Sequence, residues 1–299
     1  MTGHPFVVGP RARTSDGVEI ATYELSGDGP PIVFAHATGF HGRAWLPVAS
    51  RLTKQYRCIA FDARGHGDSG KAPRGNYDWN GLSLDVVAVM QELGLERPLA
   101  VGHSCGGAVL LLAEEAAPGT FSSLYCYEPV VPPLDEADRI RPEWPGNGNP
   151  MAEVARRRKE VFPSRQAAYS NYRSKPPFSH FVRAAVAAYV EWGFEDLPDG
   201  RIRLRCRGED EARTYEMALH HDAFLHLHRV ACTVTLACGG PTAHFGPEAI
   251  GAMAERVPRA RTEVLPKLGH FGPMEDPDEM AASIRRAFIG ITGEPGPSA

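Results

Sequence analysis

The chain lacks the features that mark several large classes of protein. Its 299 residues contain no apolar run close to the roughly 20 residues that span a bilayer, so we expect no membrane partner. The formal net charge is only -4 with both signs interleaved, and we therefore expect no nucleic-acid partner. No Gly-x-Gly-x-x-Gly spacing follows a predicted strand, so the pattern does not favour a dinucleotide-binding turn.

The cysteines do not form the pattern of a disulfide-bonded scaffold. Six cysteines in so long a chain are too dispersed for one, and Cys58, Cys126, Cys232 and Cys238 lie in apolar segments typical of a core in a reducing compartment. Cys232 and Cys238 would lie about 20 Å apart along a strand, too far to share a metal. Residues 1–10 lack a signal-peptide pattern. We expect no metal and a cytoplasmic location.

Short apolar segments alternate with helical patterns along much of the chain. This alternation, with strands apolar on both faces, predicts the α/β fold class with a mostly parallel central sheet covered by helices on both faces. The segments expected to form its strands are 31–35, 57–61, 98–101, 122–127, 232–238 and 261–265. At one edge, alternation over 18–25 predicts an antiparallel hairpin with 12–15.

The alternation stops in the middle of the chain. Residues 134–224 combine helical patterns with Pro/Gly-rich connections and contain no strong apolar strand. They are predicted to form a mainly helical cap, inserted into a core made of residues 1–133 and 225–299. Because ligands bind at the carboxyl ends of the strands in open α/β sheets, we expect the cap to pack there.

Ser104 is the candidate nucleophile. It lies in Gly102-His-Ser-Cys-Gly106, between a buried strand and an Ala/Leu-rich helix. A serine on so sharp a turn is expected to have a strained backbone and an exposed hydroxyl, and the two glycines supply the space the bend needs. The helix that follows favours the negative charge formed when a carbonyl is attacked.

A serine needs a base and a third group that orients the base. The candidate base is His270, in a glycine-flanked loop between the last strand and the last helix. The candidate acid is Glu128, which ends a strand, because loop 239–245 carries no Asp or Glu and Glu248 comes only as the next helix begins. A carboxylate buried at a strand end needs a partner, either an imidazole or, in the alternative, an arginine of the cap.

Two backbone N–H groups are expected to form an oxyanion hole. Thr38 is the candidate for the first, with Ala37 as the alternative, because this Gly-containing loop follows a strand. Cys105, the residue after the nucleophile, is the candidate for the second through its N–H and not its thiol. The segment from Asp62 to Ser69 is interpreted as a structural turn beneath the site, in which His66 is not catalytic.

Together, the segment His36 to Gly39, the turn Asp62 to Ser69, the Gly102 to Gly106 elbow and Gly269-His270 resemble the α/β-hydrolase superfamily. The placement of Glu128 is similar to that of the acid in haloalkane dehalogenases, but those enzymes and epoxide hydrolases use an aspartate nucleophile where this chain has Ser104. The resemblance therefore implies hydrolysis of an ester, thioester or lactone, without a cofactor, and not dehalogenation or epoxide opening.

The expected partner is a small ester-type substrate, and no particular oligomeric state is implied. Aromatic residues of the cap suggest a mainly apolar pocket: Trp144, Phe162, Tyr169, Tyr172, Phe178, Phe181, Tyr189 and Trp192. The basic run 156–159 is interpreted as a solvated helix face, with attraction of an acidic substrate as the alternative. The same triad would also serve a perhydrolase or a carbon–carbon bond hydrolase, and the fold alone would serve a non-catalytic receptor.

Overall fold

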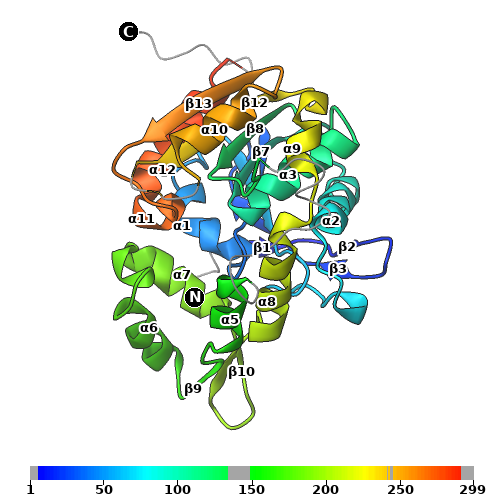
Figure 1. Cartoon of the computed structure of the whole chain (residues 1–299). Coiled ribbons are helices and arrows are strands. Elements are labelled where there is room, and N and C mark those ends of the chain that lie inside the picture. The colour runs from blue at the N-terminus through cyan, green and yellow to red at the C-terminus, as the bar shows by residue number, and fades with distance from the viewer. Residues whose placement is uncertain (1–5, 134–148, 241, 243–244, 291–299) are drawn as a thin grey trace.

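The computed structural model describes residues 6–133, 149–240, 242 and 245–290, and its centre is an eight-stranded sheet (Figure 1). The strand order is β1-β4-β6-β5-β7-β8-β12-β13. The strands are β1 (Val7–Val8), β4 (Thr22–Ser26), β5 (Pro31–Ala35), β6 (Arg57–Phe61), β7 (Leu99–His103), β8 (Ser123–Tyr127), β12 (Thr233–Gly239) and β13 (Ala260–Leu265). From β6 to β13 all neighbouring strands are parallel. At the other edge, β4 is antiparallel to β6, and β1 is antiparallel to β4.

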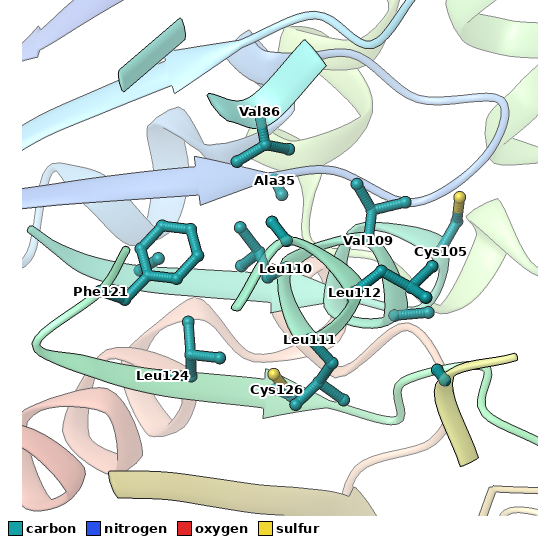
Figure 2. Close-up of a cluster of buried hydrophobic side chains, with 14 of the residues drawn as sticks. Ala35, Val86, Cys105, Val109, Leu110, Leu111, Leu112, Phe121, Leu124 and Cys126 are labelled. Atoms are coloured by element: carbon teal, nitrogen blue, oxygen red, sulfur yellow. The ribbon is translucent and has the colours of Figure 1, made fainter. Parts of the chain in front are cut away.

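Helices cover both faces of the sheet, as a parallel sheet requires. One apolar core lies between the sheet and α2 (Trp79–Glu92), α3 (Cys105–Ala116) and α10 (Pro247–Ala254). Figure 2 shows α3 directing Leu110, Leu111 and Leu112 into this core. The other core lies under α1 (Leu46–Ala49) and α12 (Pro277–Phe288). The α/β architecture expected from the alternation, a mostly parallel sheet covered by helices on both faces, is thus present.

The amino-terminal region differs from the expected single hairpin. Residues 18–25 divide between two strands, because β3 (Glu19–Ile20) pairs with β2 (Ala12–Arg13) in a separate sheet. β4 instead joins the central sheet beside β6. After β5, the chain forms a 3-10 turn at Gly42–Trp45 followed by the short helix α1.

The segment between β8 and β12 contains five helices and three short strands among its described residues. The helices are α5 (Pro150–Arg156), α6 (Arg165–Arg173), α7 (Arg183–Trp192), α8 (Gly208–Glu216) and α9 (Ala223–His226), and the strands are β9 (Val161–Phe162), β10 (Phe194–Asp196) and β11 (Ile202–Leu204). These strands form a separate antiparallel sheet that the helical pattern did not predict. Residues 134–148, including Trp144, lie outside the described residues.

This insertion packs on loops that follow the central strands. Phe40, after β5, lies in one apolar cluster with Phe181 and Tyr189 of the insertion and with Met274 of α11 (Gly272–Glu275). Figure 1 shows α5 to α8 together on one side of the sheet. Across the described residues, no helix is long and apolar enough to cross a membrane.

Candidate active site

Ser104 occupies the sharp turn that its sequence context predicts. It is the N-cap of α3, with φ 55° and ψ -120°, a backbone conformation rarely adopted by residues other than glycine. Its N–H donates to the Tyr127 carbonyl at 3.0 Å, and its own carbonyl accepts the Val130 N–H. These bonds fasten the turn to the end of β8, the neighbouring strand.

The two flanking glycines are needed for different reasons. A Cβ on Gly102 would lie 2.6 Å from the Gly107 Cα, across the bend. A Cβ on Gly106 would lie 2.4 Å from the Ala35 carbonyl oxygen, at the end of the adjacent β5. The first glycine lets the chain turn back on itself, as expected, whereas the second lets α3 approach the strand that carries the candidate oxyanion loop.

Glu128 and His270 are in direct contact, although 142 positions separate them. His270 Nδ1 and Glu128 Oε2 are 2.7 Å apart, and the glutamate is fully buried. With a carboxylate on Nδ1, the imidazole carries its proton there and leaves the Nε2 lone pair free. The side chain of His270 is 27% exposed, so solvent and small molecules can reach the imidazole.

The buried carboxylate of Glu128 is fully engaged by hydrogen-bond donors. The Gly239 N–H donates to Oε1 at 2.8 Å, and the Thr242 hydroxyl donates to Oε2 at 3.1 Å. Gly239 is the last residue of β12 and Thr242 follows the strand, so this region supplies hydrogen bonds to the carboxylate instead of a carboxylate of its own. Glu128 itself has φ 44°, so the chain turns sharply after β8 as it does after β7.

Three further side chains hold the loop of His270, and the sequence analysis did not identify them. His103 Nε2 lies 2.8 Å from the His270 carbonyl oxygen, and the Tyr127 hydroxyl donates to the Gly269 carbonyl at 2.7 Å. Glu275, in the short helix α11, accepts the Gly269 N–H at 2.6 Å. Because His103 immediately precedes Ser104, the nucleophile turn touches the histidine loop directly. In hindsight, the position of His103 inside the elbow motif was the available signal.

The candidate oxyanion residues also lie together. Thr38 and Cys105 are both buried, and the Thr38 side chain lies close enough to the Cys105 thiol to influence its pKa. Burial raises the pKa of that thiol to about 12, so it is protonated at neutral pH and is not a competing nucleophile. The Gly39 N–H is bonded to His66 Nε2 at 3.0 Å, and the Phe40 N–H to the Ala37 carbonyl. Neither of these two N–H groups is therefore free to bind an oxyanion.

The turn from Asp62 to Ser69 supports the oxyanion loop from below. Asp62 is fully buried and accepts the N–H groups of Gly42 and Asp68 and the Tyr23 hydroxyl. His66, in the same turn, accepts the Gly39 N–H, and burial lowers its pKa, which keeps the ring neutral. This arrangement fits a structural role for the turn.

Residues of two other groups, the histidine-rich segment 220–228 and the basic run 156–159, have structural partners. The ring of His221 stacks on Trp79 at 5.1 Å, and its Nε2 lies 2.9 Å from the Val130 carbonyl oxygen. Within the described part of the chain, no three His, Cys, Asp or Glu side chains are grouped to hold a metal ion. In the basic run, Arg156 pairs with Glu209 on the surface, whereas Arg158 pairs with the buried Glu211.

The sequence is similar to known proteins along most of its length. A family model described as the alpha/beta hydrolase family matches residues 32–283. Over 138 residues, 45% of this chain and 49% of the relative, the sequence is 33% identical to the non-heme chloroperoxidase of Burkholderia pyrrocinia. The chain spans less than half the length of the curated relatives it matches above 30% identity.

Two solved structures share the fold across nearly the whole chain. E-2-(acetamidomethylene)succinate hydrolase has a TM-score of 0.79 at 20% identity, covering 95% of this chain and 99% of that one. A thermophilic esterase of Thermogutta terrifontis has a TM-score of 0.70 at 20% identity, covering 97% of this chain and all of that one. The family model spans most of the chain, from β5 to α12. The protein therefore belongs to the alpha/beta hydrolase family.

Proposed function

We propose that this protein is a serine hydrolase that cleaves a carboxylic ester, lactone or thioester of a small, mainly apolar substrate through an acyl-enzyme. The proposal depends chiefly on the 2.7 Å contact between His270 and the buried Glu128, made beside the Ser104 turn. A carboxylate on Nδ1 directs the basic lone pair of the imidazole to Nε2, which is the atom that must accept a serine proton.

In this mechanism His270 removes the proton of Ser104 as Oγ attacks the acyl carbonyl, and Glu128 stabilises the imidazolium that forms. The N–H groups of Thr38 and Cys105 bind the oxyanion, aided by the amino-terminal end of α3. The imidazolium then protonates the leaving group. Water, deprotonated by the same imidazole, releases the acid and restores the serine.

The surroundings of His270 support an apolar substrate. The rings of Phe271 and Phe245 lie 5.0 and 5.4 Å from the imidazole. Phe271 contacts Phe181 of the insertion at 5.4 Å and Phe40 of the oxyanion loop at 5.8 Å. An acyl or alcohol group held beside these rings would be kept from water. One fold neighbour is an esterase, which is compatible with this chemistry.

The decisive test replaces Ser104 by alanine. We expect kcat toward p-nitrophenyl esters to fall on the order of 10³-fold or more, because the triad acts as a unit. A fluorophosphonate probe should label the wild-type protein at Ser104 and leave the variant unlabelled. The matched control is Cys105→Ala, which keeps the backbone N–H and should keep labelling and turnover.

Turnover retained in Ser104→Ala would overturn the assignment of the nucleophile. A wild-type protein that neither labels nor turns over any ester, lactone or thioester would indicate a receptor on a hydrolase fold. Varying the acyl length across the ester series, with lactones and thioesters in parallel, would then define the substrate class.

Perhydrolysis is the second candidate, favoured by the similarity to a non-heme chloroperoxidase. The same acyl-enzyme attacked by hydrogen peroxide instead of water yields a peroxy acid, which is an oxidant. Incubation with acetate and hydrogen peroxide, followed by measurement of peracetic acid, distinguishes the two. Peracid formation that Ser104→Ala abolishes would identify this activity.

A further inference from the structure

The carbonyl of Gly39 receives a hydrogen bond from the inserted segment. Gly39 directly follows Thr38, the candidate oxyanion residue, and has φ +80°. The Tyr189 hydroxyl, on α7, donates to the Gly39 carbonyl at 3.2 Å. On its other side the Gly39 N–H donates to His66 of the core. The two successive peptides on either side of the Gly39 Cα are thus held, the first through its N–H by the core and the second through its carbonyl by the insertion.

Tyr189 is itself fixed by a buried ion pair. Arg158 donates to the Tyr189 hydroxyl and forms an ion pair with Glu211 of α8. Tyr189 is 2% exposed and the Glu211 residue 5%, so these groups lie in the interior. A Cβ on Gly39 would lie 2.4 Å from Glu211 Oε1, which shows how closely the carboxylate covers the loop.

The charges in this cluster balance, which argues against a role in attracting an acidic substrate. The Glu211 carboxylate neutralises the Arg158 guanidinium, and the tyrosine hydroxyls are uncharged. Arg158 also donates to the Tyr172 hydroxyl at 3.1 Å. A balanced buried cluster of this kind restricts geometry, because each partner has only one arrangement in which all of them are bonded.

We propose that Tyr189 is a positioning residue for the oxyanion loop, held in place by Arg158 and Glu211, so that docking of the insertion sets the direction of the Thr38 N–H. This inference rests on the proposed function. Tyr189 does not contact the reacting atoms. Its hydroxyl fixes the Gly39 carbonyl, and the N–H of Thr38 lies two peptide units away on the same short loop.

The chain offers a matched pair of variants for the test. Tyr189→Phe removes the bond to Gly39 and one bond to Arg158, whereas Tyr172→Phe removes only a bond to Arg158. Arginine itself is a poor choice, because its removal would leave the Glu211 carboxylate buried and unpaired. Thermal unfolding of both phenylalanine variants should show that each folds.

We expect Tyr189→Phe to lower kcat by about 3- to 10-fold with KM little changed, the size expected for one hydrogen bond. Inhibition by a trifluoromethyl ketone, which forms a tetrahedral oxyanion on the serine, should weaken by a similar factor. Tyr172 lies in the buried apolar cluster of the insertion and keeps its ring in Tyr172→Phe, so this variant should preserve kcat and inhibition. Equal losses in the two variants, or an unchanged kcat in a folded Tyr189→Phe, would overturn the proposal.

Hydrogen exchange gives a readout that does not depend on activity. Peptides covering residues 36–42 should exchange faster in Tyr189→Phe than in wild type. In Tyr172→Phe their exchange rates should equal those of wild type. If the wild-type protein hydrolyses nothing, the proposed function fails while this measurement still tests the support of the loop. Unchanged exchange in Tyr189→Phe would contradict the inference whatever the activity.

Discussion

Replacing Glu128 by glutamine keeps its shape and changes one acceptor into a donor. The carboxylate accepts three hydrogen bonds, one on Oε1 from the Gly239 N–H and two on Oε2, from His270 and Thr242. A glutamine can place its NH₂ group at only one of these positions. At the Oε1 position it would face the Gly239 N–H, leaving two buried donors opposed at a cost of about 1–3 kcal/mol.

The NH₂ group is therefore expected at the Oε2 position, facing His270 Nδ1. The Thr242 hydroxyl can rotate to accept from it, and the imidazole can accept only if its proton moves to Nε2. That tautomer presents an N–H to Ser104 and cannot take its proton. We expect kcat to fall by about 10³- to 10⁴-fold, equivalent to about 4–5.5 kcal/mol of transition-state stabilisation.

The assay is steady-state hydrolysis of p-nitrophenyl esters at pH 8, with thermal unfolding to show that the variant folds. The control is Glu248→Gln, an exposed residue in the first turn of α10 that was the rejected candidate for the acid. It should retain full activity. A folded Glu128→Gln with kcat within tenfold of wild type, or a larger loss in Glu248→Gln, would refute the reasoning.

Other consequences concern stability and the histidine loop. Burial lowers the pKa of His36 to about 3 and of His41 to about 4, below the usual 6.5, so the unfolded chain binds more protons as pH falls. Between pH 7 and pH 5, the free energy of unfolding measured in urea should fall by about 2 kcal/mol for each ring. Equal urea midpoints at the two pH values would contradict this. Burial raises the pKa of Glu115 to about 9. The free-energy cost of keeping this carboxyl buried in the folded protein therefore grows as pH rises above 4.5. Glu115→Gln should therefore become more stable relative to wild type by up to about 1.4 kcal/mol per unit between pH 5 and 8, and a difference independent of pH would exclude this. Tyr127→Phe removes the bond to Gly269 and should lower kcat by about 3- to 10-fold, whereas unchanged kinetics would show that this bond does not position the loop.

The strands that carry the site were predictable because each is a short apolar segment bounded by turn residues. β5 and β6 have the predicted ends, and β7, β8, β12 and β13 differ by one or two residues. The serine turn was predictable because only glycine fits where Gly102 and Gly106 approach other backbone. Both signals are local, so neighbouring residues in the sequence are enough to produce them.

The hydrogen bonds around the site depend on contacts between distant segments and could not be predicted. The absence of a carboxylate after β12 pointed to Glu128, but it did not indicate that Gly239 and Thr242 would donate to that residue. The sequence likewise gives no sign that Tyr127 reaches the loop of His270, and the place of His103 in the elbow does not reveal which carbonyl it contacts. Such bonds follow from strand order, which brings the ends of β7, β8 and β12 side by side.

The basic run 156–159 shows why residue type alone does not reveal a role. Arg156 ends α5 and pairs with Glu209 and Glu216 on the surface, as a solvated helix face predicts. Two residues later the helix has ended, and Arg158 turns inward to Glu211. The change of direction, rather than the charge, puts a guanidinium beside the oxyanion loop. In the proposed role of Tyr189, this guanidinium acts on the candidate oxyanion loop through a tyrosine that does not contact the reacting atoms.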